Sequence, residues 1–269
     1  VIIAAHKIYK MPSDSMYLPV QVGAAGKDPI GFQKDDEGEN ISELNPYFCE
    51  LTGLFWAWKN LDSDYIGLVH YRRHFSLYPH RKDLWDAVLK YDEIKADLER
   101  IQGFVPAKRK YYIETLYSHY AHTHDNVQLD EARRIIEDKY PEYIEAFDTV
   151  CARTWGYMFN MMILSSDLMD EYCTWLFDIL FGMTDKLAEE TADNGYAGRN
   201  LSSFENRFPG RVSERLFNVW LEKQLETGRI KREEIVEIPF MYMENINMIK
   251  KGFIFLRAKF MGKKPEKSF

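Results

Sequence analysis

Cysteine and long apolar runs are scarce in this 269-residue chain. The three cysteines, Cys49, Cys151 and Cys173, are odd in number and widely spaced, which argues against a disulfide framework and a zinc knuckle and fits a reducing compartment. No apolar run approaches the roughly 18 residues needed to span a bilayer. The opening VIIAA has no basic segment before it and no cleavage pattern after it, so we interpret it as a first strand and not as a signal peptide. We therefore expect a cytoplasmic protein.

The motifs of several common enzyme classes are also missing. The chain has no Gly-rich phosphate loop, no GxSxG elbow and no Cys/His pair at a recognisable spacing, which argues against an NTPase, a dinucleotide oxidoreductase and a serine hydrolase. A hydrophobic content of 46%, with 15% aromatic residues, excludes a disordered chain. We find no linker that divides the chain, and we expect one globular domain over residues 1–249.

Charge is distributed unevenly along the chain, whose net charge is −7. Residues 250–269 contain seven Lys and Arg against one Glu, a net charge of +6, so residues 1–249 have a net charge of −13. The acidic part disfavours nucleic acid as a partner. The basic tail is interleaved with apolar residues such as Phe253 and Phe260, which suits an anionic membrane surface; a solvated C-terminal helix is the alternative. The tail predicts a peripheral location at the inner face of the cell membrane.

The order of apolar segments predicts an α/β fold. Val1–Ala5 and Tyr65–Val69 have the profile of buried parallel strands, and the helical spacing over Pro46–Lys59 places a helix between them. This is the length of a βαβ unit, so we expect a central, mostly parallel sheet flanked by helices. We also predict a helix over Asp83–Arg100, a strand over Tyr157–Leu164 and a helix from Ser213 to Gln224.

Adjacent arginines follow the second strand. Arg72 and Arg73 concentrate positive charge at a strand end, where such sheets bind ligands, and their planar donor groups match phosphate oxygens. His6 and Lys7, which follow the first strand, are placed to line the same crevice. The alternative is that both arginines form structural ion pairs with acidic residues of the body.

Two further patterns resemble metal sites. Asp62-Ser63-Asp64 matches the Asp-x-Asp pattern that holds a divalent cation on a sugar nucleotide, but it precedes its strand and therefore belongs at the opposite edge of the sheet. His119, His122 and His124 are clustered, yet no later histidine or cysteine completes a ligand set. We favour a capped turn for the first pattern. For the second we favour hydrogen bonding to a hydroxylated substrate or an aromatic-rich edge of the core, so we expect no bound metal.

Glu214 is the candidate general base. It follows the loop over residues 185–210, at the predicted N-terminus of a helix, where the helix dipole favours the carboxylate and desolvation in a closed site raises its pKa. The alternative is a capping residue. If Glu214 is not the base, Asp35 and Asp36 are the next candidates.

Four segments together resemble a known family. AAHK at 4–7, DDEGENISELNPYFCELTGLFWAWKNLDSDYIGLVHYRRHF at 35–75, NMMIL at 160–164 and GRVSERLFNVWL at 210–221 resemble the bacterial capsular and O-antigen glycosyltransferase domain once catalogued as a domain of unknown function. Members of this family are associated with galactofuranosyl transfer. The likeness extends to about residue 245, and the block over 35–75 is its most specific part.

The resemblance implies a GT-A-like fold, a UDP-sugar donor such as UDP-galactofuranose, and inversion at the anomeric carbon. Glu214 is then the catalytic base, and Arg72 and Arg73 stabilise the leaving diphosphate without a metal. The acceptor is a glycan or lipid-linked glycan bound near His119, His122 and His124. The donor site is assigned to Ala5, His6, Lys7, Asn40, His70, Tyr71 and Asn160.

Two other functions remain open from the residues alone. One is a metal-dependent hydrolase that uses the three histidines, and the other is a carbohydrate- or nucleotide-binding module without catalysis.

Overall fold

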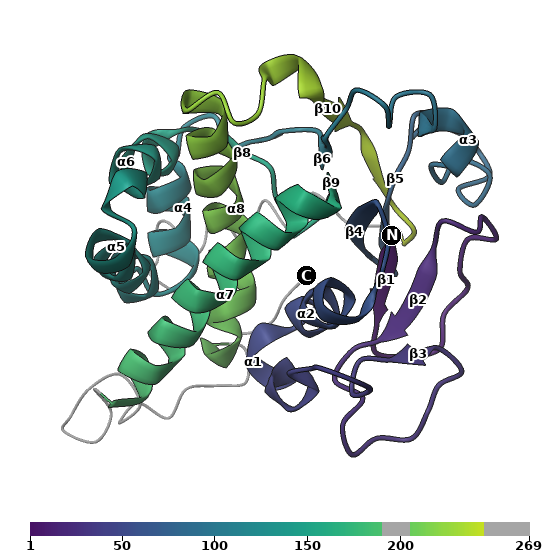
Figure 1. The fold of residues 1–269 in the computed structure, drawn as a ribbon, viewed down its shortest axis with the longest axis horizontal. Coiled ribbons are helices and arrows are strands. Elements are labelled where there is room, and N and C mark those ends of the chain that lie inside the picture. The colour runs from purple at the N-terminus through teal and green to yellow at the C-terminus, as the bar shows by residue number, and fades with distance from the viewer. Residues whose placement is uncertain (190–204, 245–269) are drawn as a thin grey trace.

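The structure, a computed structural model, describes residues 1–189 and 205–244. A nine-stranded sheet lies beside a group of helices (Figure 1). Its strands are β1 (Ile2–Ala5), β2 (Leu18–Gln21), β3 (Gln33–Lys34), β4 (Tyr65–His70), β5 (Arg73–Phe75), β6 (Gly103–Pro106), β9 (Met162–Ser165), β10 (Ile235–Ile238) and β11 (Phe240–Tyr242). A second, two-stranded sheet pairs β7 (Arg109–Lys110) with β8 (Trp155–Gly156).

The longer helices lie on one face of the sheet and beside it, whereas the short helix α3 packs against the other face. Those of the α type are α1 (Asn45–Phe48), α2 (Leu51–Asn60), α3 (Tyr91–Ile94), α4 (Leu116–Thr123), α5 (Val127–Lys139), α6 (Ile144–Ala152), α7 (Ser166–Glu189) and α8 (Phe208–Glu226). Short 3-10 helices are η1 (Ser42–Leu44), η2 (Pro141–Tyr143), η4 (Glu205–Arg207) and η5 (Arg232–Glu234). Helix α2 contacts β1 and β4, α7 contacts β4 and β9, and α4, α5 and α6 form a group to one side (Figure 1). No helix in these two ranges is long and apolar enough to cross a membrane.

The order and direction of the strands determine which loops lie at the same edge of the sheet. The order is β10-β6-β9-β4-β1-β2-β3; β1, β2, β3 and β4 are mutually parallel, and β10 is parallel to β6. Strand β9 is antiparallel to both of its neighbours, β4 and β6. The carboxyl ends of β1, β4 and β6 therefore lie at one edge of the sheet, together with the start of β9. This confirms the predicted mixed, mostly parallel α/β sheet and selects that edge as the place for a ligand.

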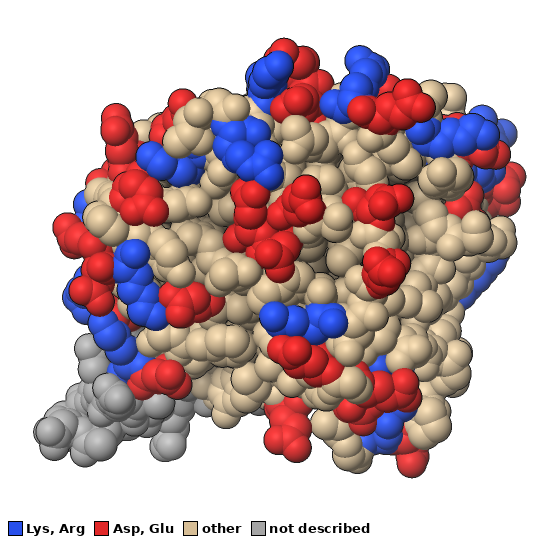
Figure 2. All heavy atoms as spheres, viewed as in Figure 1, with Lys and Arg blue, Asp and Glu red and all other residues tan. Residues whose placement is uncertain are grey.

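Both faces of the sheet are buried, which explains the continuous apolar runs in its strands. Ile2 and Ala4 face the larger core, beneath α2, α7 and α8, whereas Ile3 and Ala5 face a second core. Figure 2 shows the outer surface of the helical layer, where Asp and Glu side chains outnumber Lys and Arg near the centre.

Three predicted elements differ from the observed ones. The helix expected over 46–59 is split into α1 and α2, because Cys49 has a φ of 53° between them. The segment 83–100 forms only α3 and turns; its apolar residues, including Val88 and Ile94, are buried in the second core without a continuous helix. The strand predicted over 157–164 begins only at Met162, because positive φ angles at Phe159 and Asn160 interrupt extended backbone. The predicted basic tail, residues 250–269, lies outside the described residues.

A buried carboxylate fixes the turn after β2. Asp35 is fully buried, and it accepts hydrogen bonds from the backbone N–H groups of Gly23 (2.8 Å) and Ala24 (2.9 Å). The hydroxyls of Ser42 (2.5 Å) and Thr52 (2.7 Å) donate to the same carboxylate. With four donors already bound, Asp35 stabilises the fold and cannot act as the alternative base suggested by the sequence.

Asp35→Asn should therefore destabilise the fold, because an amide group turns one of these acceptors into a donor that faces another donor. We expect the free energy of unfolding to fall by about 2–4 kcal/mol, measured by urea denaturation. Asp62→Asn, in an exposed turn, should change it by less than about 0.5 kcal/mol. Equal losses for the two variants would contradict the role of Asp35.

Candidate functional site

Basic side chains gather around Tyr71 at the carboxyl ends of β1 and β4. The Lys7 ammonium and the Arg72 guanidinium each lie 5.3 Å from the Tyr71 ring, and the His6 ring meets it edge-on at 5.3 Å. Ala5 is the buried last residue of β1, and its carbonyl accepts a hydrogen bond from the Val22 amide. The structure thus brings the strand-end residues predicted from the sequence into one place.

The pKa values of two histidines show how concentrated this charge is. Burial lowers the pKa of His6, and the charges of Arg72, Lys7, Arg207 and Lys27 lower it further. Burial, followed by the charges of Arg73 and Arg72, lowers the pKa of His70 to about 3. Of these cations, Arg72 has a carboxylate nearby, that of Glu244 at 3.8 Å. The sequence analysis did not predict Arg207 and Lys27 as site residues, because only the fold brings residues from distant loops to this edge.

Arg73 points into a different part of the same edge, among aromatic rings. Its guanidinium lies 3.9 Å from the centre of the Phe159 ring and 4.8 Å from that of Tyr242, and Arg109 lies 5.7 Å from the Phe159 ring. Burial lowers the pKa of Arg73, while the nearby Tyr242, Glu214 and Glu50 oppose that shift. A guanidinium keeps its charge in a protein, so Arg73 is an enclosed cation.

The chain makes a left-handed turn just before β9. Phe159 and Asn160 have φ angles of 78° and 52°, a conformation that costs a residue other than glycine about 1–3 kcal/mol. Hydrogen bonds of Asn160 hold the turn: its amide nitrogen donates to Glu50 Oε1 (2.8 Å) and to the Gly210 carbonyl (2.9 Å), and its oxygen accepts from the Ser213 hydroxyl (2.9 Å). Asn160 thus joins the start of α2 to the start of α8.

Glu214 meets the same turn from the side of α8. Its Oε1 accepts a hydrogen bond from the Phe159 amide at 3.1 Å, and its Oε2 pairs with Arg215 at 2.9 Å. The side chain is 22% exposed, so an acceptor hydroxyl can approach it.

The predicted position of Glu214 within its helix was wrong. Helix α8 begins at Phe208, with Pro209 in its first turn, and not at Ser213, because proline is favoured in a first helical turn. Glu214 is therefore nearly two turns inside the helix, and Arg215 and the Phe159 amide replace the helix dipole as the groups that stabilise its charge.

Glu50 is a site residue that the sequence did not reveal. It lies at the N-terminus of α2, directly after the break at Cys49. Burial raises the pKa of Glu50, and the charge of Glu214 raises it further, against the Asn160 hydrogen bond and the charge of Arg73. The contacts of Glu50 depend on the break between α1 and α2. The helical spacing of the apolar residues over 46–59 gives no sign of that break.

The three clustered histidines point in different directions. His119 packs on Tyr111, with ring centres 4.3 Å apart, and burial together with the charges of Arg215 and Arg109 lowers its pKa to about 3. His122 Nδ1 lies 2.7 Å from Glu114 Oε1, and the His124 ring packs on Tyr120. Among residues 1–189 and 205–244, no three His, Cys, Asp or Glu side chains form a group that could hold a metal ion. Of the three, His119 adjoins the Glu214 side of the site, through Arg215.

Asn40 does not join the site. Its amide nitrogen donates to the carbonyls of Asp36 (3.2 Å) and Gly38 (2.8 Å), and its oxygen accepts from the Ser42 amide (3.1 Å). The loop it stabilises is bound to Asn60, the last residue of α2, through the backbone of Glu39. That end of α2 leads toward the start of β4, at the other edge of the sheet, so the donor-binding role predicted for Asn40 has no support in the structure.

The Asp-x-Asp pattern also lies at the other edge, as its order in the sequence predicts. Asp62 and Asp64 directly precede β4, and the Asp64 carbonyl accepts a hydrogen bond from the Ser166 amide at 2.8 Å. This segment is a turn that joins the start of β4 to the start of α7, remote from Arg72 and Arg73.

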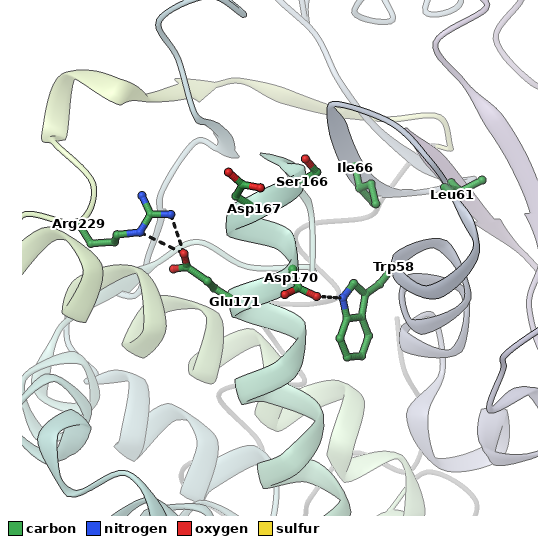
Figure 3. A pocket seen from close by; sticks show the side chains of 8 residues that line it. All are labelled: Trp58, Leu61, Ile66, Ser166, Asp167, Asp170, Glu171 and Arg229. Carbon is green, nitrogen blue, oxygen red and sulfur yellow. Dashed lines mark hydrogen bonds and ion pairs between the residues drawn. The ribbon is translucent and has the colours of Figure 1, made fainter.

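A hollow of about 470 Å³ lies at this same remote edge (Figure 3). Its polar walls are largely paired: the Trp58 indole donates to Asp170 at 2.7 Å, and Arg229 pairs with Glu171 at 2.6 Å. The hollow begins near Ile66 at the start of β4, whereas the basic groups follow the end of that strand. The hollow and the basic groups are therefore at opposite edges of the sheet.

His74, a buried histidine next to Arg73, predicts that the folded protein is less stable at acidic pH. Burial lowers the pKa of His74 from its ordinary 6.5 to about 4. Between these pH values the unfolded chain takes up a proton at His74 that the folded chain does not, so the free energy of unfolding falls as the pH falls.

His74→Phe should reduce this pH dependence by up to about 1.4 kcal/mol per pH unit, measured by urea denaturation between about pH 7 and pH 4.5. His80→Phe, at an exposed position, should leave the dependence unchanged. A slope for His74→Phe equal to that of the wild type would rule out a role for His74.

One solved structure with the same fold is that of a WbbM bifunctional glycosyltransferase in its apo form, at a TM-score of 0.75 and 30% sequence identity. The match covers 91% of this chain and 45% of that one, so the chain spans less than half the length of this relative. No curated protein matches the chain. The likeness confirms the GT-A-like α/β fold expected from the sequence. A family model matches residues 1–225, and the chain therefore belongs to the family described as a domain of unknown function, DUF4422.

Proposed function

We propose that the protein is an inverting glycosyltransferase that transfers galactofuranose from UDP-galactofuranose to a growing capsular, exopolysaccharide or O-antigen glycan. The observation that chiefly supports this is the arrangement at the carboxyl edge of the sheet. There, Arg73 lies near both the cations that follow β4 and the carboxylate of Glu214, which is held by the Phe159–Asn160 turn. The likeness to a bifunctional glycosyltransferase over 91% of the chain supports the same class of reaction.

The cations would bind the diphosphate of the donor. Lys7 and Arg72 project around Tyr71, and Arg73 lies deeper beside Phe159. Guanidinium groups bind phosphate oxygens through paired N–H donors and stabilise the negative charge that develops on the leaving group. Ala5, His6, His70 and Tyr71 would border the nucleotide side of this site. The Asn160 side chain is buried and its polar groups are already hydrogen-bonded, so Asn160 would support the sugar side through the turn and would not contact the sugar.

Transfer would proceed in one displacement. An acceptor hydroxyl oxygen attacks the anomeric carbon and forms the new glycosidic bond. The bond from that carbon to the diphosphate oxygen breaks, and its electron pair leaves with UDP. Glu214 takes the hydroxyl proton, and attack from the face opposite the leaving group inverts the anomeric centre. His119 lies near Arg215, which pairs with Glu214, and would border the acceptor.

We propose that no divalent metal is required, because the arginines supply the charge that a metal would otherwise place on the diphosphate. One observation supports this: Asp62 and Asp64, the Asp-x-Asp pattern, are at the opposite edge of the sheet. The basic tail over 250–269 is proposed to hold the protein on an anionic membrane, where a lipid-linked acceptor would be found.

Glu214→Gln should lower kcat by about 10²- to 10⁴-fold, because the amide cannot accept the acceptor's proton. UDP affinity should stay close to that of the wild type, since the diphosphate is bound by other groups. The assay is transfer from UDP-galactofuranose to a glycan acceptor, with the anomeric configuration of the product determined by NMR. Glu226→Gln, at the exposed end of the same helix, is the matched control. Full turnover by Glu214→Gln would place the base elsewhere, and binding of the donor with no turnover by the wild type would favour a binding module.

Arg72→Ala should weaken UDP binding by about 10- to 100-fold, as expected for the loss of charge-assisted hydrogen bonds to phosphate. Arg72 is 40% exposed, so its removal should leave the free energy of unfolding nearly unchanged. Arg229→Ala, which breaks an equally exposed ion pair at the opposite edge, is the control for loss of one positive charge. Equal UDP affinities of the two variants would contradict the assignment of Arg72 to the diphosphate.

A further inference from the structure

The Phe159–Asn160 turn binds two carboxyl groups that are 164 positions apart in the sequence. The backbone amide of Phe159 donates to Glu214 from α8, and the side-chain amide of Asn160 donates to Glu50 from the start of α2. Because the two donors belong to consecutive residues, neither carboxyl group can shift without disturbing the support of the other.

Asn160 is fixed so that it presents a donor to Glu50. One proton of its amide nitrogen is directed to the Gly210 carbonyl and the other to Glu50, while its oxygen accepts from Ser213. A flip of the amide would break all three hydrogen bonds. The position of the Glu50 carboxyl is therefore set by the same network that shapes the turn.

Charged and titratable groups surround Glu50 from several segments. Glu214 faces it from α8 and Arg73 from β5, the thiol of Cys49 adjoins it in the chain, and Arg207 and Arg211 are near that thiol. Burial raises the pKa of that thiol to about 12, so Cys49 is uncharged near neutral pH. Arg73 is thus a cation that both carboxyl groups share. Glu214 also pairs with Arg215, and the two carboxyl groups repel each other when both are charged.

We propose that Glu50 is a positioning residue that controls the basicity of Glu214, which rests on the function proposed above. A negative charge on Glu50 favours uptake of a proton by Glu214, because two adjacent carboxylates repel each other and the repulsion is relieved when one is protonated. A proton on Glu50 removes this repulsion and makes Glu214 a weaker base.

The pair predicts a specific pH dependence of transfer. The rate should rise with pH as Glu50 ionises, over a range above the ordinary titration of a glutamate, because its enclosure favours the neutral form. Glu50→Gln removes the charge but keeps an oxygen that can accept the Asn160 hydrogen bond. We expect this variant to lose about tenfold in kcat and to lose this acid limb, with the KM for the donor nearly unchanged.

The first test does not depend on turnover. The carboxyl carbons of ¹³C-labelled glutamate are titrated by NMR, with the Glu50 signal identified by its absence in Glu50→Gln. We expect Glu50 to titrate above the ordinary range in the wild type and at lower pH in Glu214→Gln, where the neighbouring charge is gone. Glu43→Gln, at an exposed position, should leave the Glu50 titration unchanged. A Glu50 titration that is ordinary, or identical in the wild type and Glu214→Gln, would overturn the proposal.

The second test is the pH profile of kcat for the wild type, Glu50→Gln and Glu50→Ala. Glu50→Ala also removes the acceptor for Asn160 and should lose more activity than Glu50→Gln; if it does not fold, Glu50→Gln still gives the decisive profile. An unchanged acid limb in Glu50→Gln would overturn the positioning role. So would full activity of Glu214→Gln together with an inactive Glu50→Gln, which would make Glu50 itself the base. Absence of transfer by the wild type would refute the proposed function, while the NMR titration would still decide whether the pair exists.

Discussion

The left-handed turn at Phe159 and Asn160 is the constraint on which the rest of the site depends. Two consecutive non-glycine residues in this conformation cost about 1–3 kcal/mol each, and the hydrogen bonds to Glu50, Gly210, Ser213 and Glu214 offset that cost. The same turn ends the loop before β9 and places the Phe159 ring under Arg73. One short segment thereby fixes a carboxylate, an aromatic ring and an enclosed guanidinium relative to one another.

Basic residues are concentrated at the edge of the sheet where this turn lies. The chain is acidic overall, with a net charge of −7, yet Lys7, Arg72, Arg73 and Arg207 come together at the carboxyl edge of the sheet. Concentrated positive charge is a favourable environment for an anionic ligand, and burial together with these cations lowers the pKa of His70 and His6. In the function proposed above, the diphosphate of a nucleotide would bind these cations, and Glu214 would accept the proton of the attacking hydroxyl.

The sequence predicted what depends on local pattern. Apolar runs located β1 and β4, and the position of the arginine pair directly after the second strand located the basic edge. It did not predict Glu50, because its role depends on a break at Cys49 inside an unbroken helical pattern. It misplaced the start of α8, because Pro209 reads as a loop residue although it is favoured in a first turn. Asn40 was assigned by resemblance, and the hydrogen bonds that occupy it could not be read from its spacing.

The central claim is that side chains of this edge, and not a metal ion, bind the diphosphate. Calorimetric titration of the protein with UDP, in EDTA and again with Mn²⁺ added back, tests it most directly. The account predicts binding of equal affinity with and without EDTA. Binding that appears only with Mn²⁺ would contradict the claim and require a metal site among other residues. No binding under either condition would contradict the proposal that the protein binds a nucleotide.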